Sequence, residues 1–212
     1  MKRALAAAGC LVVATASAHA DVKVDWARGL VIADAVGIAD RNAPNPAVAR
    51  GTSRRGAEDA ARQQLTGKLD DLPVAGGGTV GAKAKDKAVR ARLARAVDQA
   101  ITLAAEPETD GAWRVTLAVP IEAVRQALAG RRVLGPDGDK ASAVIVVEGA
   151  GAAKPAVGWT VAGLEAPTLW VADVPGWAKD AHRARAKSAK AGAIDVAGID
   201  ASAATLFVIV TR

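Results

Sequence analysis

Hydrophobic residues follow a helical period through residues 46–105, the most strongly patterned part of the chain. Pro46 suits the first turn of a helix, where a missing backbone N–H loses no hydrogen bond. Small apolar residues then recur at roughly helical spacing: Ala47, Val48, Gly51, Ala57, Ala60, Ala61 and Leu65. The pattern predicts a helix with an inward face of small side chains. Gly51 and Gly56 indicate a close backbone approach, or a break near residue 51.

A second helix is predicted after a glycine-marked connection. Its apolar stripe lies at four-residue intervals, in Val89, Leu93, Val97 and Ile101. Pro107 is expected to end it, because proline interrupts the hydrogen bonds of a helix interior.

Alternating and continuous apolar runs predict strands on either side of these helices. Residues 21–38 are expected to form one or two strands, with Gly29 or Gly37 at a bend or bulge. Residues 113–119 alternate between apolar and polar side chains and predict the most clearly amphipathic strand of the chain.

The C-terminal part is predicted to be rich in strands. Residues 120–128 indicate a short helix that ends at Gly130. Residues 131–140 contain turn-forming glycine and proline, and predict a domain boundary or a long hairpin loop. The apolar runs at 143–147 and 205–210 are short enough to be buried strands.

The first 20 residues have the pattern of a secretory signal peptide. Lys2 and Arg3 precede an apolar middle, and Ala18-His19-Ala20 precedes the expected cleavage point. We therefore expect an exported protein, either periplasmic or associated with the outer membrane.

Cys10 raises the alternative of lipoprotein processing, but lipidation there is not expected. The apolar stretch before Cys10 is shorter than the roughly 7 to 15 residues of a signal's apolar region. No later run approaches the about 20 apolar residues of a membrane-spanning helix, so none is expected in the mature chain. Because Cys10 is the only cysteine, cleavage after Ala20 would exclude disulfides and cysteine chemistry.

Charge changes this picture only slightly. Without residues 1–20 the chain keeps 26 basic and 22 acidic residues, a formal excess of four positive charges. This excess favours anionic envelope components as partners. The chain has no tyrosine and a single phenylalanine, so it is poor in the aromatic platforms of nucleic-acid binders, and no nucleic-acid partner is expected.

Patterns typical of catalytic and cofactor sites are incomplete. The glycine-rich residues 76–81 lack the Gly-Lys-Ser/Thr of a phosphate loop. His182 would be the only histidine left after cleavage, and no serine lies in a Gly-x-Ser-x-Gly elbow. Neighbouring acids such as Asp70 and Asp71 are typical of solvated loops. We therefore predict no enzyme, no cofactor and no metal site.

Two groups of residues are candidates for binding. The run from Lys179 to Lys190 places Lys179, Arg183 and Lys187 on one stripe of a helix, a candidate contact surface. Trp159, Trp170 and Trp177 are candidates for lining a groove for a sugar, peptide or small molecule. Burial in the core is the favoured interpretation for these tryptophans, because cores use tryptophan routinely.

The chain resembles the LPP20 family of bacterial envelope proteins, whose domain type also occurs in the N-terminal part of the flagellar assembly protein T. The resemblance rests on the order of an extended N-terminal segment, the helix PNPAVARGTSRRGAEDAARQQL, a second helix and the strand DGAWRVTLAVPI. The later blocks VIVVEGAGAAKPAVGWTV and IDVAGIDASAATL are similar to the C-terminal half of such proteins.

This resemblance implies an α+β fold of two layers, with helices packed on one face of a mostly antiparallel sheet. We accordingly expect a signal peptide in residues 1–20, an LPP20-like domain in residues 21–130, and a β-rich portion in residues 131–212 packed on the same sheet. The family is exported, often lipid-anchored and without known catalysis.

Function is therefore expected to be contact rather than chemistry. The first hypothesis is an exported, non-enzymatic envelope protein that binds envelope proteins or anionic components, in outer-membrane or flagellar assembly. The alternative is a periplasmic polysaccharide- or small-molecule-binding module that uses the tryptophan-rich C-terminal region. A hydrolase acting through carboxylates ranks last.

Overall fold

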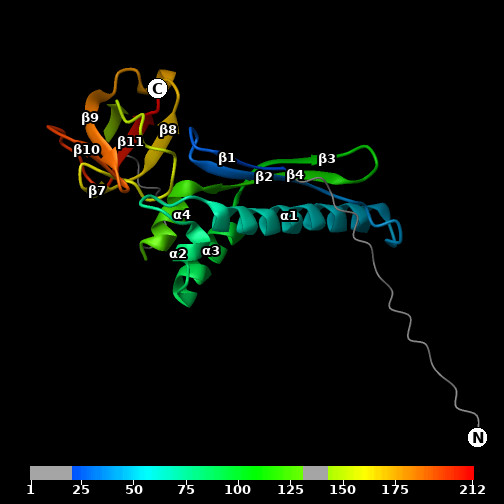
Figure 1. Ribbon diagram of the computed structural model, residues 1–212. Helices are drawn as coiled ribbons and strands as arrows, with labels where there is room; N and C mark the ends of the chain where they lie inside the picture. Colours follow the sequence, from blue (N-terminus) through cyan, green and yellow to red (C-terminus); the bar gives the residue numbers. More distant parts are fainter. Residues whose placement is uncertain (1–20, 131–142) are drawn as a thin grey trace, which may run out of the picture.

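The computed structural model describes residues 21–130 and 143–212. Their strands form two separate sheets, and the helices lie with the first (Figure 1). In chain order the elements are β1 (Asp21–Asp25), β2 (Leu30–Gly37), α1 (Pro46–Asp71), α2 (Val80–Lys83), α3 (Lys87–Asp98), β3 (Ile101–Pro107), β4 (Trp113–Pro120), α4 (Ile121–Leu128), β5 (Ala143–Glu148), β6 (Thr160–Val161), β7 (Leu164–Glu165), β8 (Thr168–Val171), the 3-10 turn η1 (Gly176–Ala178), β9 (His182–Lys190), β10 (Ala193–Val196) and β11 (Thr205–Val210).

The first sheet has four antiparallel strands in the order β1-β2-β4-β3. Helix α1 runs along one of its faces, and together they form an arm that extends away from the second sheet (Figure 1). At 1.5 Å per residue, the 26 residues of α1 span about 39 Å. Ala57, Ala61, Leu65 and Leu69 are buried against the strands. The predicted face of small side chains is confirmed from Ala57 to Leu65.

Local sequence explains where α1 begins. The Asn45 side chain accepts a hydrogen bond from the Val48 N–H at 3.0 Å, and Pro46 takes the first helical position, as predicted. The helix is continuous through Gly51 and Gly56, and a Cβ added at either glycine would meet no atom within 4 Å. The expected break or close approach there is wrong.

The close backbone approach lies instead at Gly37 of β2. A Cβ at Gly37 would lie 1.9 Å from the carbonyl oxygen of Ser53 in α1. The Ser53 hydroxyl donates a hydrogen bond to the Gly37 carbonyl oxygen at 2.6 Å. Strand and helix are therefore in contact through their backbones at this point.

The second predicted helix is shorter than its pattern indicated. Helix α3 ends at Asp98, and Ile101 begins strand β3, which pairs with β4 as far as Pro107. The expected end at Pro107 is wrong, because hydrogen bonds to β4 hold residues 101–107 extended. A four-residue spacing does not reveal such a pairing partner.

Other predicted elements are confirmed. Residues 21–38 contain β1 and β2, with Gly29 at positive φ in the turn between them. The amphipathic strand is β4, the short helix is α4, and the two apolar runs are β5 and β11. The signal peptide, Cys10 and the boundary predicted in residues 131–140 lie outside the described residues.

The second sheet has seven strands in the order β7-β6-β10-β9-β5-β11-β8. Strand β11 is parallel to both β5 and β8, and β9 is parallel to β5. Strands β6 and β8 lie near opposite edges of the sheet. Nevertheless, Val161 of β6 and Trp170 of β8 belong to one buried cluster with Ile145 and Phe207. The sheet therefore curls around its own core.

The expected two-layer α+β fold is wrong. The described residues are mostly β, with 11 strands in two sheets, and the second sheet is curled and partly parallel. The error arises at the C-terminal strands, which pair among themselves and not with the sheet that α1 covers. The division into residues 21–130 and 131–212 stays a prediction.

Backbone hydrogen bonds join the two parts at two places. The N–H of Trp170 donates to the carbonyl of Trp26, in the turn after β1, at 3.1 Å. The Ala75 N–H donates to the Val157 carbonyl, and the Val157 N–H donates to the Pro73 carbonyl, both at 2.8 Å. These contacts attach the arm to the curled sheet at one end of α1 (Figure 1).

Candidate functional site

Strand β9 carries most of the predicted basic contact surface, and it is extended, not helical. Arg183, Arg185 and Lys187 are exposed, while Ala184 and Ala186 between them pack against the core cluster of the curled sheet. The helical stripe expected for Lys179, Arg183 and Lys187 is therefore wrong. Alternation of alanine with basic residues was the signal for a strand, and it also includes Arg185, which the helical interpretation omitted.

A β-bulge lets strand β9 keep alanines on its core-facing side and basic residues on its exposed side. Opposite β10, Ser188 pairs with Asp195 and Ala186 pairs with Val196, which leaves Lys187 as the extra residue. The core-facing alanines are spaced two and then three residues apart, at Ala184, Ala186 and Ala189. The extra residue absorbs this change, so alanines on both sides of the bulge contact the same core.

The 3-10 turn η1 lies over the same face of the sheet as the cations of β9. Ala178 of η1 is buried in a small cluster with Val146 of β5 and Val208 of β11. Val146 is the register neighbour of Arg183. Neighbouring residues in register project to the same side of a sheet, so η1 and Arg183 lie next to one another on that side. We call Lys179, which follows η1, together with Arg183, Arg185 and Lys187 the basic face.

Positive charge on the basic face is only partly neutralised. Arg183 forms an exposed ion pair with Glu148 at 2.9 Å. Among the described residues, no ion pair is formed by Lys179, Arg185 or Lys187. Asp195 on β10 is the other acidic residue of the strands beside β9. With Asp180 beside Lys179 also counted, the four cations of the basic face exceed the neighbouring acids Glu148, Asp195 and Asp180 by one, so the face keeps a modest positive excess.

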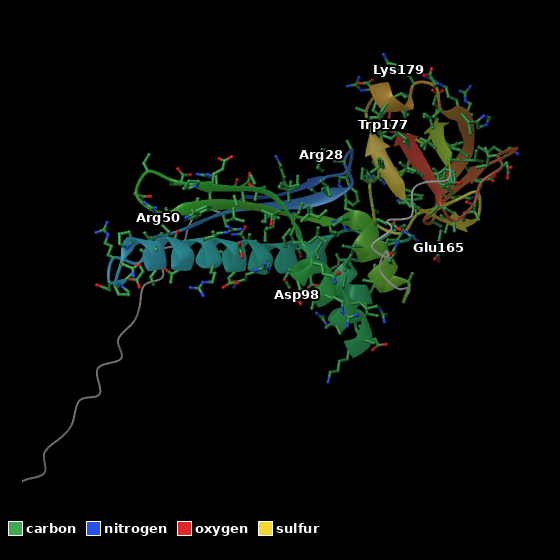
Figure 2. The ribbon with its side chains drawn as sticks, turned by 180° about the vertical axis from the view of Figure 1, so that it is seen from behind. Arg28, Arg50, Asp98, Glu165, Trp177 and Lys179 are labelled. Atoms are coloured by element: carbon green, nitrogen blue, oxygen red, sulfur yellow. The ribbon has the colours of Figure 1, made fainter. Side chains whose placement is uncertain are left out.

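The three candidate groove tryptophans do not lie together. Trp159 and Trp170 are buried in the core of the curled sheet, with ring centroids 5.6 Å apart in an edge-on arrangement. The Trp159 indole N–H donates to the Lys154 carbonyl at 3.2 Å. Trp177 lies on η1 with 60% of its surface exposed, at the same end of the molecule as Lys179 (Figure 2).

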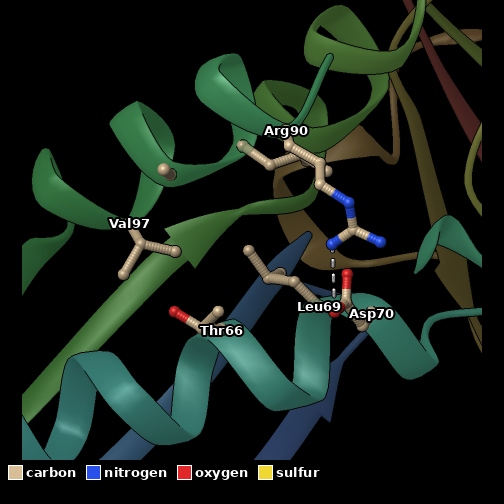
Figure 3. A pocket seen from close by; sticks show the side chains of 7 residues that line it. Thr66, Leu69, Asp70, Arg90 and Val97 are labelled. Carbon is tan, nitrogen blue, oxygen red and sulfur yellow. Dashed lines mark ion pairs between the residues drawn. The ribbon is translucent and has the colours of Figure 1, made fainter. Parts of the chain in front are cut away.

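A pocket between α1 and α3 was not anticipated from the sequence. It has a volume of about 220 Å³. Its lining is mostly apolar and comes from both helices: Thr66, Leu69, Asp70, Arg90, Leu93, Ala94 and Val97 (Figure 3). Arg90 and Asp70 lie 3.8 Å apart and are both partly exposed. The apolar stripe of α3 predicted a packed face, and that prediction did not indicate that the two helices leave a hollow between them.

A polar groove lies on the face of the first sheet opposite α1. Arg114 donates to Asp34 at 3.1 Å and to Glu108 at 2.9 Å, and Thr116 donates to Asp34 at 3.2 Å. The hydrogen bond to Glu108, followed by the interactions with Asp34, raises the pKa of Arg114 above its ordinary value. These side chains bond to one another across neighbouring strands, which makes the groove a structural ion-pair network.

No family model matches the chain, and no curated protein matches it. The resemblance to the LPP20 family therefore stays a prediction.

Within residues 21–130 and 143–212, no three histidine, cysteine, aspartate or glutamate side chains are grouped closely enough to hold a metal ion. None of the helices in those ranges is both long and apolar enough to span a membrane. His182 is exposed at the start of β9.

The basic face contains all three residues of the contact surface predicted from the sequence. The sequence predicts one surface for Lys179, Arg183 and Lys187 on the wrong assumption of a helix, and the strand and η1 nevertheless place them on one side of the curled sheet. The chemistry of this surface is electrostatic, because it offers guanidinium and ammonium groups to an anion.

Proposed function

We propose that this chain is an exported, non-enzymatic protein of the cell envelope that works by contact and binds an anionic envelope component through its basic face. The observation that carries the proposal is strand β9, which presents Arg183, Arg185 and Lys187 on one side while its alanines fill the core. Export rests on the pattern of residues 1–20, and a role in outer-membrane or flagellar assembly rests on the family resemblance.

The proposal predicts that reversing charge on β9 weakens binding. Residues 21–212 carrying Arg185→Glu and Lys187→Glu would be compared with the unchanged protein in co-sedimentation with isolated cell envelopes. Each cation near an anionic surface contributes about 1 kcal/mol, so the double variant is expected to bind at least about 30-fold more weakly. Binding by the unchanged protein should also fall as salt is raised, because the Debye length shortens.

A matched control carries the same change of charge elsewhere. Lys85 and Lys87 are exposed on either side of Asp86, the N-cap of α3, so Lys85→Glu with Lys87→Glu alters net charge equally without touching the basic face. The control should bind as the unchanged protein does. Equal losses in both double variants would show that net charge alone governs binding, and undiminished binding by the β9 variant would remove the basic face as the contact surface.

A further inference from the structure

Trp177 is the only aromatic side chain among the large exposed hydrophobic residues of the described ranges. It is presented by a short structured turn. Ala178, the next residue, is 1% exposed, and its N–H donates to the Pro175 carbonyl at 2.9 Å. The buried alanine therefore fixes η1 on the sheet while the neighbouring indole extends into solvent (Figure 2).

Cations lie on the same side of the sheet as η1, which carries this indole. Lys179 follows two residues later, and Arg183 lies beside Val146, the residue that η1 covers. Arg185 and Lys187 continue the row along β9. The acids close to this row of cations are Asp180, Asp173, Glu148 and Asp195, of which Asp173 pairs with Arg212 and Glu148 pairs with Arg183. Trp177 is thus an exposed aromatic group at the edge of a positive surface.

This combination fits the boundary between lipid headgroups and acyl chains. Tryptophan is enriched at that boundary because its ring is apolar while its N–H still forms hydrogen bonds. Lysine and arginine beside it gain from the negative surface potential of anionic lipids. Trp177 lines neither of the two hollows described above, and its indole is therefore presented on a convex part of the surface.

We infer that the anionic component bound by the basic face is a lipid bilayer surface, into whose headgroup layer Trp177 inserts while Lys179, Arg183, Arg185 and Lys187 contact the headgroups. The inference rests on the proposed function and specifies its partner. Binding then depends on two separable contributions, an electrostatic one from the cations and an apolar one from the indole.

The test uses residues 21–212 and vesicles of phosphatidylcholine with or without phosphatidylglycerol. The unchanged protein should co-sediment with the anionic vesicles and not with pure phosphatidylcholine. Trp177→Ala should lower the affinity about tenfold, and Trp177→Phe should lie between the two, because less apolar surface is inserted. Ile38 is also 60% exposed but lies at the end of β2, so Ile38→Ala is a matched control that should bind normally.

Fluorescence separates insertion from simple attraction. The chain has five tryptophans, so the spectrum of Trp177→Phe subtracted from that of the unchanged protein isolates Trp177. Anionic vesicles should shift this difference spectrum to shorter wavelength, and brominated lipids should quench it.

Three results would overturn the lipid inference: affinity unchanged in Trp177→Ala, a difference spectrum that does not shift, or binding to soluble polyglutamate without binding to vesicles. If the β9 variant still loses binding to cell envelopes in any of these cases, the proposed function stands with another anionic partner. If that variant binds envelopes normally, the proposed function fails as well.

Discussion

Gly37 and Ser53 form a close backbone contact between β2 and α1 in the arm. The Ser53 hydroxyl and the Gly37 carbonyl are buried between α1 and β2, and the helix approaches so closely that there is no room for a Cβ at position 37. A glycine in a strand usually weakens it, but here the absence of a side chain permits contact between two backbones.

Gly37→Ala is expected to destabilise the protein by at least about 2 kcal/mol, because the new methyl group would overlap the Ser53 carbonyl. Ser53→Ala should cost about 1–3 kcal/mol by leaving the Gly37 carbonyl without its donor. Urea unfolding followed by circular dichroism measures both. A midpoint unchanged by Gly37→Ala would contradict the close approach of α1 to β2.

The sequence pattern predicts which residues of α1 are buried. It does not predict which residues are needed for contacts between elements. Ala57, Ala61 and Leu65 were recognisable from their spacing, because helical period and burial are directly related. Gly37 was recognised only as a bend or bulge. Its role depends on Ser53, 16 residues away, and contacts between elements leave no periodic signal.

At the scale of elements, α1 carries glycines that it does not use for packing. Gly56 and Gly67 are exposed within the helix, and neither would bring a Cβ within 4 Å of another atom. Each therefore weakens the helix through the backbone entropy of the unfolded chain, without a compensating contact.

Replacing Gly56 and Gly67 by alanine should stabilise the protein by about 0.5–1 kcal/mol per substitution. The urea midpoint of the double variant should rise, in the opposite direction to Gly37→Ala, although the chemical change is the same. A midpoint that falls would mean that these positions are not solvent-facing parts of a continuous helix.

Strand β9 illustrates why a sequence reveals the basic character of a segment more readily than whether that segment is a helix or a strand. Both a helical stripe and a strand put Arg183 and Lys187 on one side, and the bulge at Lys187 breaks the strict two-residue period. Arg185 distinguishes the two, since it lies on the exposed side only in a strand. Basic character was evident from the sequence, whereas the partner strands β5 and β10, which hold β9 extended, were not.

The whole molecule consists of an arm and a curled sheet joined at one end (Figure 1). Pairing of β5 with β11 and of β11 with β8 brings together segments separated by long stretches of chain and is parallel throughout. Individual strands were predictable from apolar runs such as residues 143–147, but their partners were not. The single, mostly antiparallel sheet was expected from the family resemblance, and the apolar runs carry no information on strand partners that could correct it.

An extended shape has a direct consequence in solution. A compact domain of 192 residues would have a radius of gyration of about 16 Å. We expect small-angle X-ray scattering of residues 21–212 to give a clearly larger value, because α1 and its sheet extend away from the curled sheet. A value near 16 Å would contradict this arrangement, in which the arm is attached at one end only.

The place of β11 in the curled sheet affects the order in which the protein folds. Strand β8 has no neighbour in that sheet except β11, and β5 has one side open until β11 pairs with it. During synthesis the chain emerges from its N-terminus first, so β11 emerges after the other strands of the described residues. The arm has all its strands earlier, whereas the curled sheet closes only when β11 has emerged, so its apolar edges stay exposed to aggregation until then.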